Sequence, residues 1–357
     1  MKISFAIVGV LLLAACPGFM EPLVPFIADH QANRITSFSL GVPNEYVKIA
    51  ADTITVNVTV PYRTPLIPAI IHMGTNIIPA SGVEQDFINP VVYTVYSKTG
   101  ATRQYTVKVF VIETFDVSNT AEMNDAVTAI ANGGNYKSYE IRVTEDVGMT
   151  QAVNAHWGTA DLFRNFRSAD NIKVTITGGG SITYDSDSNG WLFIIGPGQH
   201  LILKDIEIIG KTGGQPVIGI IGELTMEAGS SVSGRTVNTT PPDCSAVYVR
   251  GGKFTMNGGE IVNNKNLNAG STVGKGAGVC VLLGEFIMND GIIAGNSTNR
   301  IGGGVYIGSG CTFTMTGGEI FGNSASSGGG VYVEAGGTFN NNYPAGIYGN
   351  SPDDVWP

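Results

Sequence analysis

The 357-residue chain has little charge and few cysteines. Charged residues make up 14% of it and the formal net charge is -9, with no cluster of lysine or arginine. A basic nucleic-acid-binding face is therefore excluded, and no nucleic acid is expected as a partner. The cysteines Cys16, Cys244, Cys280 and Cys311 include no CxxC pair. Neither a zinc site nor a disulfide framework is indicated.

Glycine and apolar residues are abundant instead. With 49 glycines and 43% hydrophobic residues, the composition suits neither a disordered acidic chain nor a helical bundle. The length exceeds that of one compact domain, so the sequence predicts several units or one elongated repeat. We expect an all-β fold with many tight turns.

The N-terminus has the pattern of a secretion signal. Lys2 precedes an apolar run over residues 3–15, which is shorter than the roughly 17 to 25 residues that span a bilayer as a helix. The sequence LAAC at 13–16 resembles the lipobox of bacterial lipoproteins, which implies a signal peptide over 1–15 and lipidation of Cys16. The membrane would then be a partner through this lipid, with 16–33 as a tether, at the outer membrane or cell surface. The alternative is a plain secretion signal with an incidental cysteine.

A small antiparallel β-sandwich is predicted over residues 34–113. Period-two alternation marks residues 35–40, 54–60, 91–96 and 104–112, and prolines and glycines fall between these segments. Their order, with the paired YTV segments at 93–95 and 105–107, resembles an Ig-like module of bacterial surface lipoproteins. The resemblance implies a spacer or adhesive module.

A short capping helix is predicted next, at about 119–132. Asn119 is a suitable N-cap, Glu122 follows three residues on, and Gly133 and Gly134 end the pattern. Strand patterns alone follow it. Such a helix suits the N-terminal cap of a β-solenoid, whose first coil has an apolar end to cover.

Residues 114–357 are predicted to form a parallel β-helix. Toward the C-terminus a strand, an aromatic residue, an isoleucine and an asparagine recur together every 26 to 32 residues. The recurring side chains are Phe254, Phe286, Phe313 and Phe339; Ile261, Ile293, Ile320 and Ile347; and Asn264, Asn296, Asn323 and Asn350. Equivalent positions should stack, with the phenylalanines inside and the asparagines hydrogen-bonded from coil to coil.

This region resembles the pectin-lyase-like right-handed β-helix superfamily. Within it, IFGNSASSGGGVYV at 320–333 is similar to the repeat of polymorphic membrane proteins of the adhesin type. The resemblance implies a surface β-helix with an adhesive role.

Few residues suggest chemistry. Asp185, Asp187 and Asn189 match the first half of a calcium-binding loop, but the closing position is Gly196, and a polar turn is the simpler interpretation. No carboxylate pair recurs beside a histidine or arginine, so no catalytic residue is assigned. The outward side chains Tyr248, Tyr306, Tyr332 and Glu319 are the candidate surface contacts, and the simpler alternative for the tyrosines is that they stack on one another.

We therefore expect a cell-envelope lipoprotein that acts in adhesion or structural display. A glycan or a host or matrix protein is the expected partner, no cofactor is expected, and the protein is not expected to be an enzyme. The alternatives are a carbohydrate-active β-helix enzyme, a polysaccharide lyase or hydrolase, and a passive spacer.

Overall fold

The computed structural model describes residues 33–42, 45–58, 65–149, 166, 169–184, 191–213, 216–237, 246–267 and 274–357. The signal segment, Cys16, nearly all of the predicted tether and the calcium candidates Asp185, Asp187 and Asn189 lie outside these ranges. Within them the chain is almost entirely β-strand, with the single α-helix α2 (Thr120–Asn132). None of the helical segments described is long and apolar enough to cross a membrane.

The N-terminal part is a β-sandwich. One sheet pairs β1 (Ile35–Ser39) with β4 (Ala69–His72). The other runs in the order β2 (Tyr46–Ala50), β3 (Thr53–Val58), β7 (Thr102–Val117), β6 (Val91–Tyr96) and β5 (Asn76–Ile78). Alternate side chains of both sheets enclose a common core. The predicted sandwich is present, but β3 and β7 are parallel, because the long chain between them crosses over rather than turning back as a hairpin.

The described residues of 114–357, which we call the solenoid, form three stacks of parallel strands. The first stack contains β7, β8 (Ser138–Val143), β10 (Ile172–Thr177), β13 (Gln199–Leu203), β17 (Glu223–Met226), β25 (Thr312–Met315) and β28 (Thr338–Asn341). The second contains β9 (Val147–Met149), β11 (Ser181–Tyr184), β14 (Glu207–Gly210), β18 (Ser231–Ser233), β26 (Glu319–Phe321) and β29 (Ile347–Tyr348). The third contains β12 (Phe193–Ile195), β16 (Ile218–Ile220), β24 (Val305–Ile307), β27 (Val331–Val333) and β30 (Val355–Trp356).

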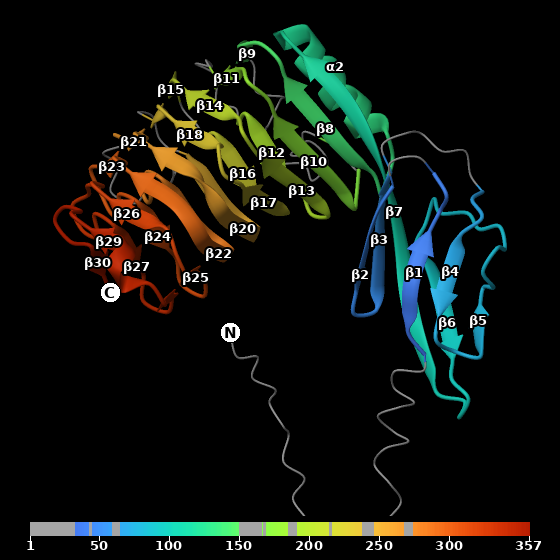
Figure 1. The fold of residues 1–357 in the computed structure, drawn as a ribbon. Coiled ribbons are helices and arrows are strands. Elements are labelled where there is room, and N and C mark those ends of the chain that lie inside the picture. The colour runs from blue at the N-terminus through green and yellow to red at the C-terminus, as the bar shows by residue number, and fades with distance from the viewer. Residues whose placement is uncertain are drawn as a thin grey trace, which may run out of the picture.

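Two long strands, β20 (Val247–Val262) and β22 (Val279–Ala294), pass through all three stacks. A smaller stack of short parallel strands joins the coils beyond the second stack: β15 (Thr212–Gly213), β19 (Thr236–Val237), β21 (Lys265–Asn266) and β23 (Ser297–Thr298). A 3-10 turn, η1 (Pro344–Gly346), precedes β29. Figure 1 shows the coils following one another in a curved row away from the sandwich.

The solenoid core consists of ladders of identical side chains. The rings of Phe254, Phe286, Phe313 and Phe339 stack with neighbouring centroids 4.6 to 4.7 Å apart. This spacing equals that of hydrogen-bonded strands, because equivalent residues of adjacent coils are register partners. The predicted inner phenylalanine stack is confirmed.

The helix α2 covers the N-terminal end of this core. Its N-cap is Asn119, whose side chain accepts a hydrogen bond from the backbone N–H of Glu122 at 3.0 Å. Buried side chains from one face of α2, Met123 and Ile130 among them, join the core cluster of the solenoid, and the helix lies against β7 and β9. The helix coincides with the predicted cap.

Candidate functional site

The predicted tyrosine stripe lies on the outer face of the third stack. Tyr248, Cys280, Tyr306 and Tyr332 are register partners on successive coils. Tyr248 and Tyr306 are nevertheless buried, with 7% and 0% of their surface exposed, whereas Tyr332 is partly buried. Residues between the strands cover them: Ile301 packs against the buried cluster that contains Tyr248 and Tyr306, and Lys275 lies over the Tyr306 ring. The strand alternation directs these rings outward, but the loops fold over them.

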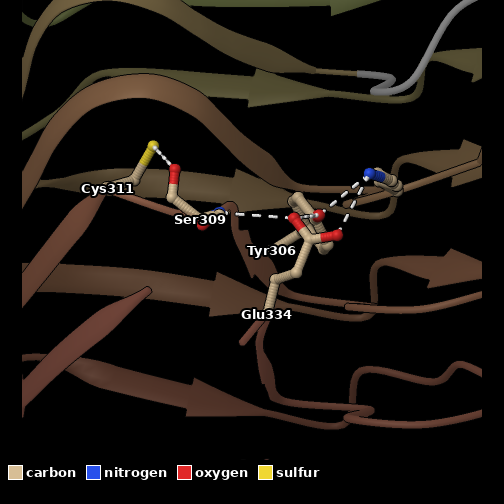
Figure 2. Close-up of polar contacts among 5 residues, drawn as sticks. Tyr306, Ser309, Cys311 and Glu334 are labelled. Carbon is tan, nitrogen blue, oxygen red and sulfur yellow. Dashed lines mark hydrogen bonds and ion pairs between the residues drawn. The ribbon is translucent and has the colours of Figure 1, made fainter. Parts of the chain in front are cut away.

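A polar network closes over Tyr306. Its hydroxyl donates to Oε2 of Glu334 at 2.5 Å and accepts from Nζ of Lys275 at 2.9 Å (Figure 2). The Lys275 ammonium also lies 4.8 Å from the ring centroid. Burial, followed by the bond to Glu334, raises the pKa of Tyr306, and the hydrogen bond from Tyr306 lowers the pKa of Glu334. Tyr306 is thus a neutral donor inside a network and does not contact solvent.

Trp191 fills a gap in the same column. Gly219 lies in register between Ile194 and Tyr248, and a Cβ on it would be 2.8 Å from the Trp191 ring. The indole stacks on Tyr248 with centroids 5.5 Å apart and an interplanar angle of 22°. The glycine at this position therefore makes room for the indole.

Glu319 lies in an acidic groove on the second stack. This groove has a volume of about 720 Å³ and contains four carboxylates and one tyrosine: Glu207, Glu260, Asp290, Glu319 and Tyr343. Glu260, Ile292 and Glu319 are register partners on consecutive coils. Ile292 therefore separates the two glutamates. Among the described residues no group of three or more histidine, cysteine, aspartate or glutamate side chains forms a metal cluster.

A second, larger groove lies where the sandwich meets the solenoid. We call it the junction groove; its volume is about 910 Å³, and strands β3 and β7 on one side and coils of the first stack on the other line it. It exists because β7 belongs to both parts. Residues 106–111 of β7 pair with β3, and residues 112–117 pair with β8. The strand therefore holds the two walls together (Figure 1).

The sandwich wall of this groove presents aromatic and polar side chains. Along β7, Val107 and Val109 are buried in the sandwich core, so Lys108 and Phe110 lie on the opposite face and line the groove. Their register partners on β3, Thr55 and Asn57, line it as well. Tyr46, which is 65% exposed, is paired with Asn57 and extends the row on β2.

The solenoid wall presents one column of charged side chains. Lys173, His200, Glu223, Lys253 and Glu285 are register partners on five consecutive coils, and all of them line the groove. Nζ of Lys253 lies 3.0 Å from Oε1 of Glu285. Parallel stacking therefore sets these polar groups in a row at intervals of about 4.8 Å.

His200 is the titratable group at the centre of this column. Its Nε2 lies 2.8 Å from the hydroxyl of Thr225, and its Nδ1 lies 3.9 Å from Oε2 of Glu223. Burial lowers the pKa of His200, and the attraction of Glu223 opposes this effect only in part. The imidazole is accordingly neutral at pH 7, when one ring nitrogen donates and the other accepts.

Sequence reasoning placed the surface contacts on the tyrosine stripe and missed the junction groove. The sequence does contain one indication of the junction, because residues 102–117 include neither glycine nor proline. An uninterrupted strand across the boundary predicted at 113 indicates that the two parts share a sheet.

The geometry defines a β-sandwich joined through one strand to a parallel-strand solenoid, with a polar groove at the junction. Residues 35–109, which form nearly all of the sandwich, match a family model described as "SGBP, N-terminal". No curated protein matches the chain. A crystal structure of a proposed glycoside hydrolase from Bacteroides thetaiotaomicron is 29% identical, but the match covers 23% of this chain and 26% of that one. With a TM-score of 0.21, this likeness carries no argument about fold or function.

Proposed function

We propose that this protein binds a glycan at the surface of a bacterial cell envelope, and that the junction groove is the binding site. The match of residues 35–109 to the SGBP model is the observation that carries the proposal, because SGBPs are surface glycan-binding proteins of Bacteroidetes. It narrows the sequence-based expectation of adhesion or display to recognition of a sugar. A host or matrix glycoprotein presents the same chemistry through its glycans.

The chemistry of the groove suits a sugar chain. A carbohydrate offers apolar ring faces and many hydroxyl groups, so it is held by aromatic surfaces together with side chains that donate and accept hydrogen bonds. Phe110 supplies a half-buried ring, while Asn57, Thr55 and the charged column on the first stack supply the polar groups. Tyr306 cannot stack on a sugar ring in this way, because its side chain is fully buried.

The test is binding of the purified full chain to a polysaccharide panel by isothermal titration calorimetry. Phe110→Ala is expected to weaken binding about five- to tenfold, since loss of a stacking ring costs about 1 kcal/mol or more. The matched control is Tyr348→Ala, which removes an aromatic ring that is 44% exposed and lies outside the groove. Equal binding by Phe110→Ala and the wild type contradicts the groove assignment, and absence of binding to any glycan favours the passive spacer.

Binding without turnover is part of the proposal. In the charged column Lys253 separates Glu223 from Glu285 and is ion-paired to the latter, so adjacent coils of this column do not present a free carboxylate pair to a ligand in the junction groove. The alternative, that the protein is a polysaccharide lyase or hydrolase, is tested by incubating the protein with each polysaccharide that it binds and assaying for cleavage products. Release of reducing or unsaturated ends would make it an enzyme.

We further infer that the solenoid is a right-handed parallel β-helix of the pectin-lyase-like kind. Crossovers between parallel strands are almost always right-handed, which supports this hand.

For the anchor, we propose lipidation of Cys16 and attachment to the outer membrane or cell surface. Metabolic acyl labelling should mark the wild type and not Cys16→Ala, and equal labelling of both would refute the lipid assignment.

A further inference from the structure

The junction groove has a charge balance unlike that of the whole chain. The protein carries a formal charge of -9, yet three lysines and two glutamates line this groove: Lys108, Lys173, Lys253, Glu223 and Glu285. The acidic groove on the second stack has four carboxylates and no cation among its lining residues. The two grooves therefore favour ligands of opposite charge.

Two of the groove lysines are available to a ligand. Lys253 is ion-paired with Glu285. Lys108 and Lys173, in contrast, have neither an ion pair nor a side-chain hydrogen bond with any residue of the chain that is described here, and both reach the groove. An unpaired ammonium in a partly enclosed groove gains most from an anionic group of the ligand.

The distance between these lysines indicates an extended ligand. Lys173 is in register with Ser138, which is in register with Ile112 on β7, and Lys108 lies four residues before Ile112. At about 3.3 Å per residue and 4.8 Å per strand, the two positions are roughly 16 Å apart along the sheet. Such a span exceeds one sugar ring. Phe110 lies between Lys108 and Ile112 on the same strand.

We propose, on the basis of the glycan binding proposed above, that the junction groove takes an anionic polysaccharide. Carboxylate or sulfate groups on separate sugar units pair with Lys108 and Lys173, and the unit between them packs on Phe110. Each ion pair is partly exposed, so removing one lysine weakens binding by about two- to fivefold. The two positions are far enough apart for their effects to multiply.

The experiment measures affinity for two matched pairs of polysaccharides, polygalacturonate with its methyl ester and dextran sulfate with dextran. The full chain is compared with Lys108→Gln, Lys173→Gln and the double variant. Lys98→Gln and Lys265→Gln are the controls, because both remove an exposed lysine outside the groove. Melting temperatures of all variants verify that they fold.

We expect at least one charged polysaccharide to bind more tightly than its neutral partner, and added salt to weaken that binding. Preference for polygalacturonate identifies carboxylate as the recognised group, and preference for dextran sulfate identifies sulfate. The inference is overturned if the neutral polysaccharides bind as tightly as the charged ones, or if the groove variants bind like the control variants. Either result leaves the proposed glycan-binding function unaffected. If no polysaccharide of either charge or of the wider panel binds, the proposed function itself fails.

Discussion

The side-chain amide of Asn296 donates a hydrogen bond to Oδ1 of Asn323, which lies 3.0 Å away and one coil further along the solenoid. Asn323 donates in the same way to Asn350 at 2.9 Å, and Asn350 donates to Oδ1 of Asp354 at 2.9 Å. The ladder predicted from the spacing of the asparagines is confirmed. Asp354 occupies the place of the next amide, and its carboxylate ends the ladder by accepting.

Replacement of Asn323 by leucine should destabilise the solenoid. The buried amide of Asn323 also donates to the carbonyl oxygens of Ile293 and Phe321, and its oxygen accepts from the backbone of Asn296. Several buried groups lose their partners, so we expect a loss of about 3–5 kcal/mol in the free energy of unfolding, measured in urea. The exposed Asn340→Leu should change it by less than about 0.5 kcal/mol. Equal losses in the two variants would contradict the role of the ladder.

In the phenylalanine stack, replacing an inner ring should destabilise the solenoid more than replacing the terminal ring. Phe286 is fully buried between Phe254 and Phe313, whereas Phe339 is partly exposed and, among the described rings, stacks only on Phe313. We expect Phe286→Ala to cost about 3–5 kcal/mol, because it leaves a cavity inside the core, and Phe339→Ala to cost less than half as much. Thermal and urea unfolding measure both. A larger cost at the terminal ring would be evidence against the stacking order.

Tyr306→Phe should change the titration of Glu334. The hydrogen bond from the Tyr306 hydroxyl is the largest cause of the lowered Glu334 pKa. A carboxylate with a lowered pKa stabilises the fold above its unfolded pKa, and this contribution disappears as the pH falls through the folded value. The variant should therefore show a higher Glu334 pKa in an NMR titration and a smaller loss of melting temperature on acidification. Tyr348→Phe, which removes a donor to Glu319, is the control and should leave Glu334 unchanged.

His200→Gln should flatten the dependence of stability on pH between 7 and 5. Burial lowers the pKa of His200, with Lys173 acting in the same direction and Glu223 and Glu227 against it. The unfolded chain then binds the proton more readily than the folded chain. The contribution of the neutral His200 to the free energy of unfolding is therefore fully present above pH 6.5, and it is lost as the pH falls from 6.5 to the folded pKa. Glutamine keeps a polar contact with Thr225 but does not titrate. Melting curves at pH 7, 6 and 5 measure the effect, and identical slopes for both proteins would disprove it.

Much of the solenoid could be predicted because identical residues recur at a fixed spacing. In parallel coils that spacing places like side chains on top of one another, as with Phe286 and Phe313 or Asn296 and Asn323. The alternation within Val305–Ile307 likewise predicted that Tyr306 leaves the core. It could not predict that Ile301 and Lys275 would bury this ring, because the position of a loop depends on contacts between coils.

The sequence by itself determined the sandwich, the capping helix and the ladders, since each depends on local periodicity or on a repeat that stacks on itself. Tertiary structure alone decided the junction groove. Lys108 and Phe110 are far in sequence from Lys173 and His200, and they line one groove only because β7 pairs first with β3 and then with β8. The lack of glycine and proline over residues 102–117 indicates one uninterrupted strand. It does not indicate the groove, because the two strands with which β7 pairs are determined by long-range hydrogen bonds.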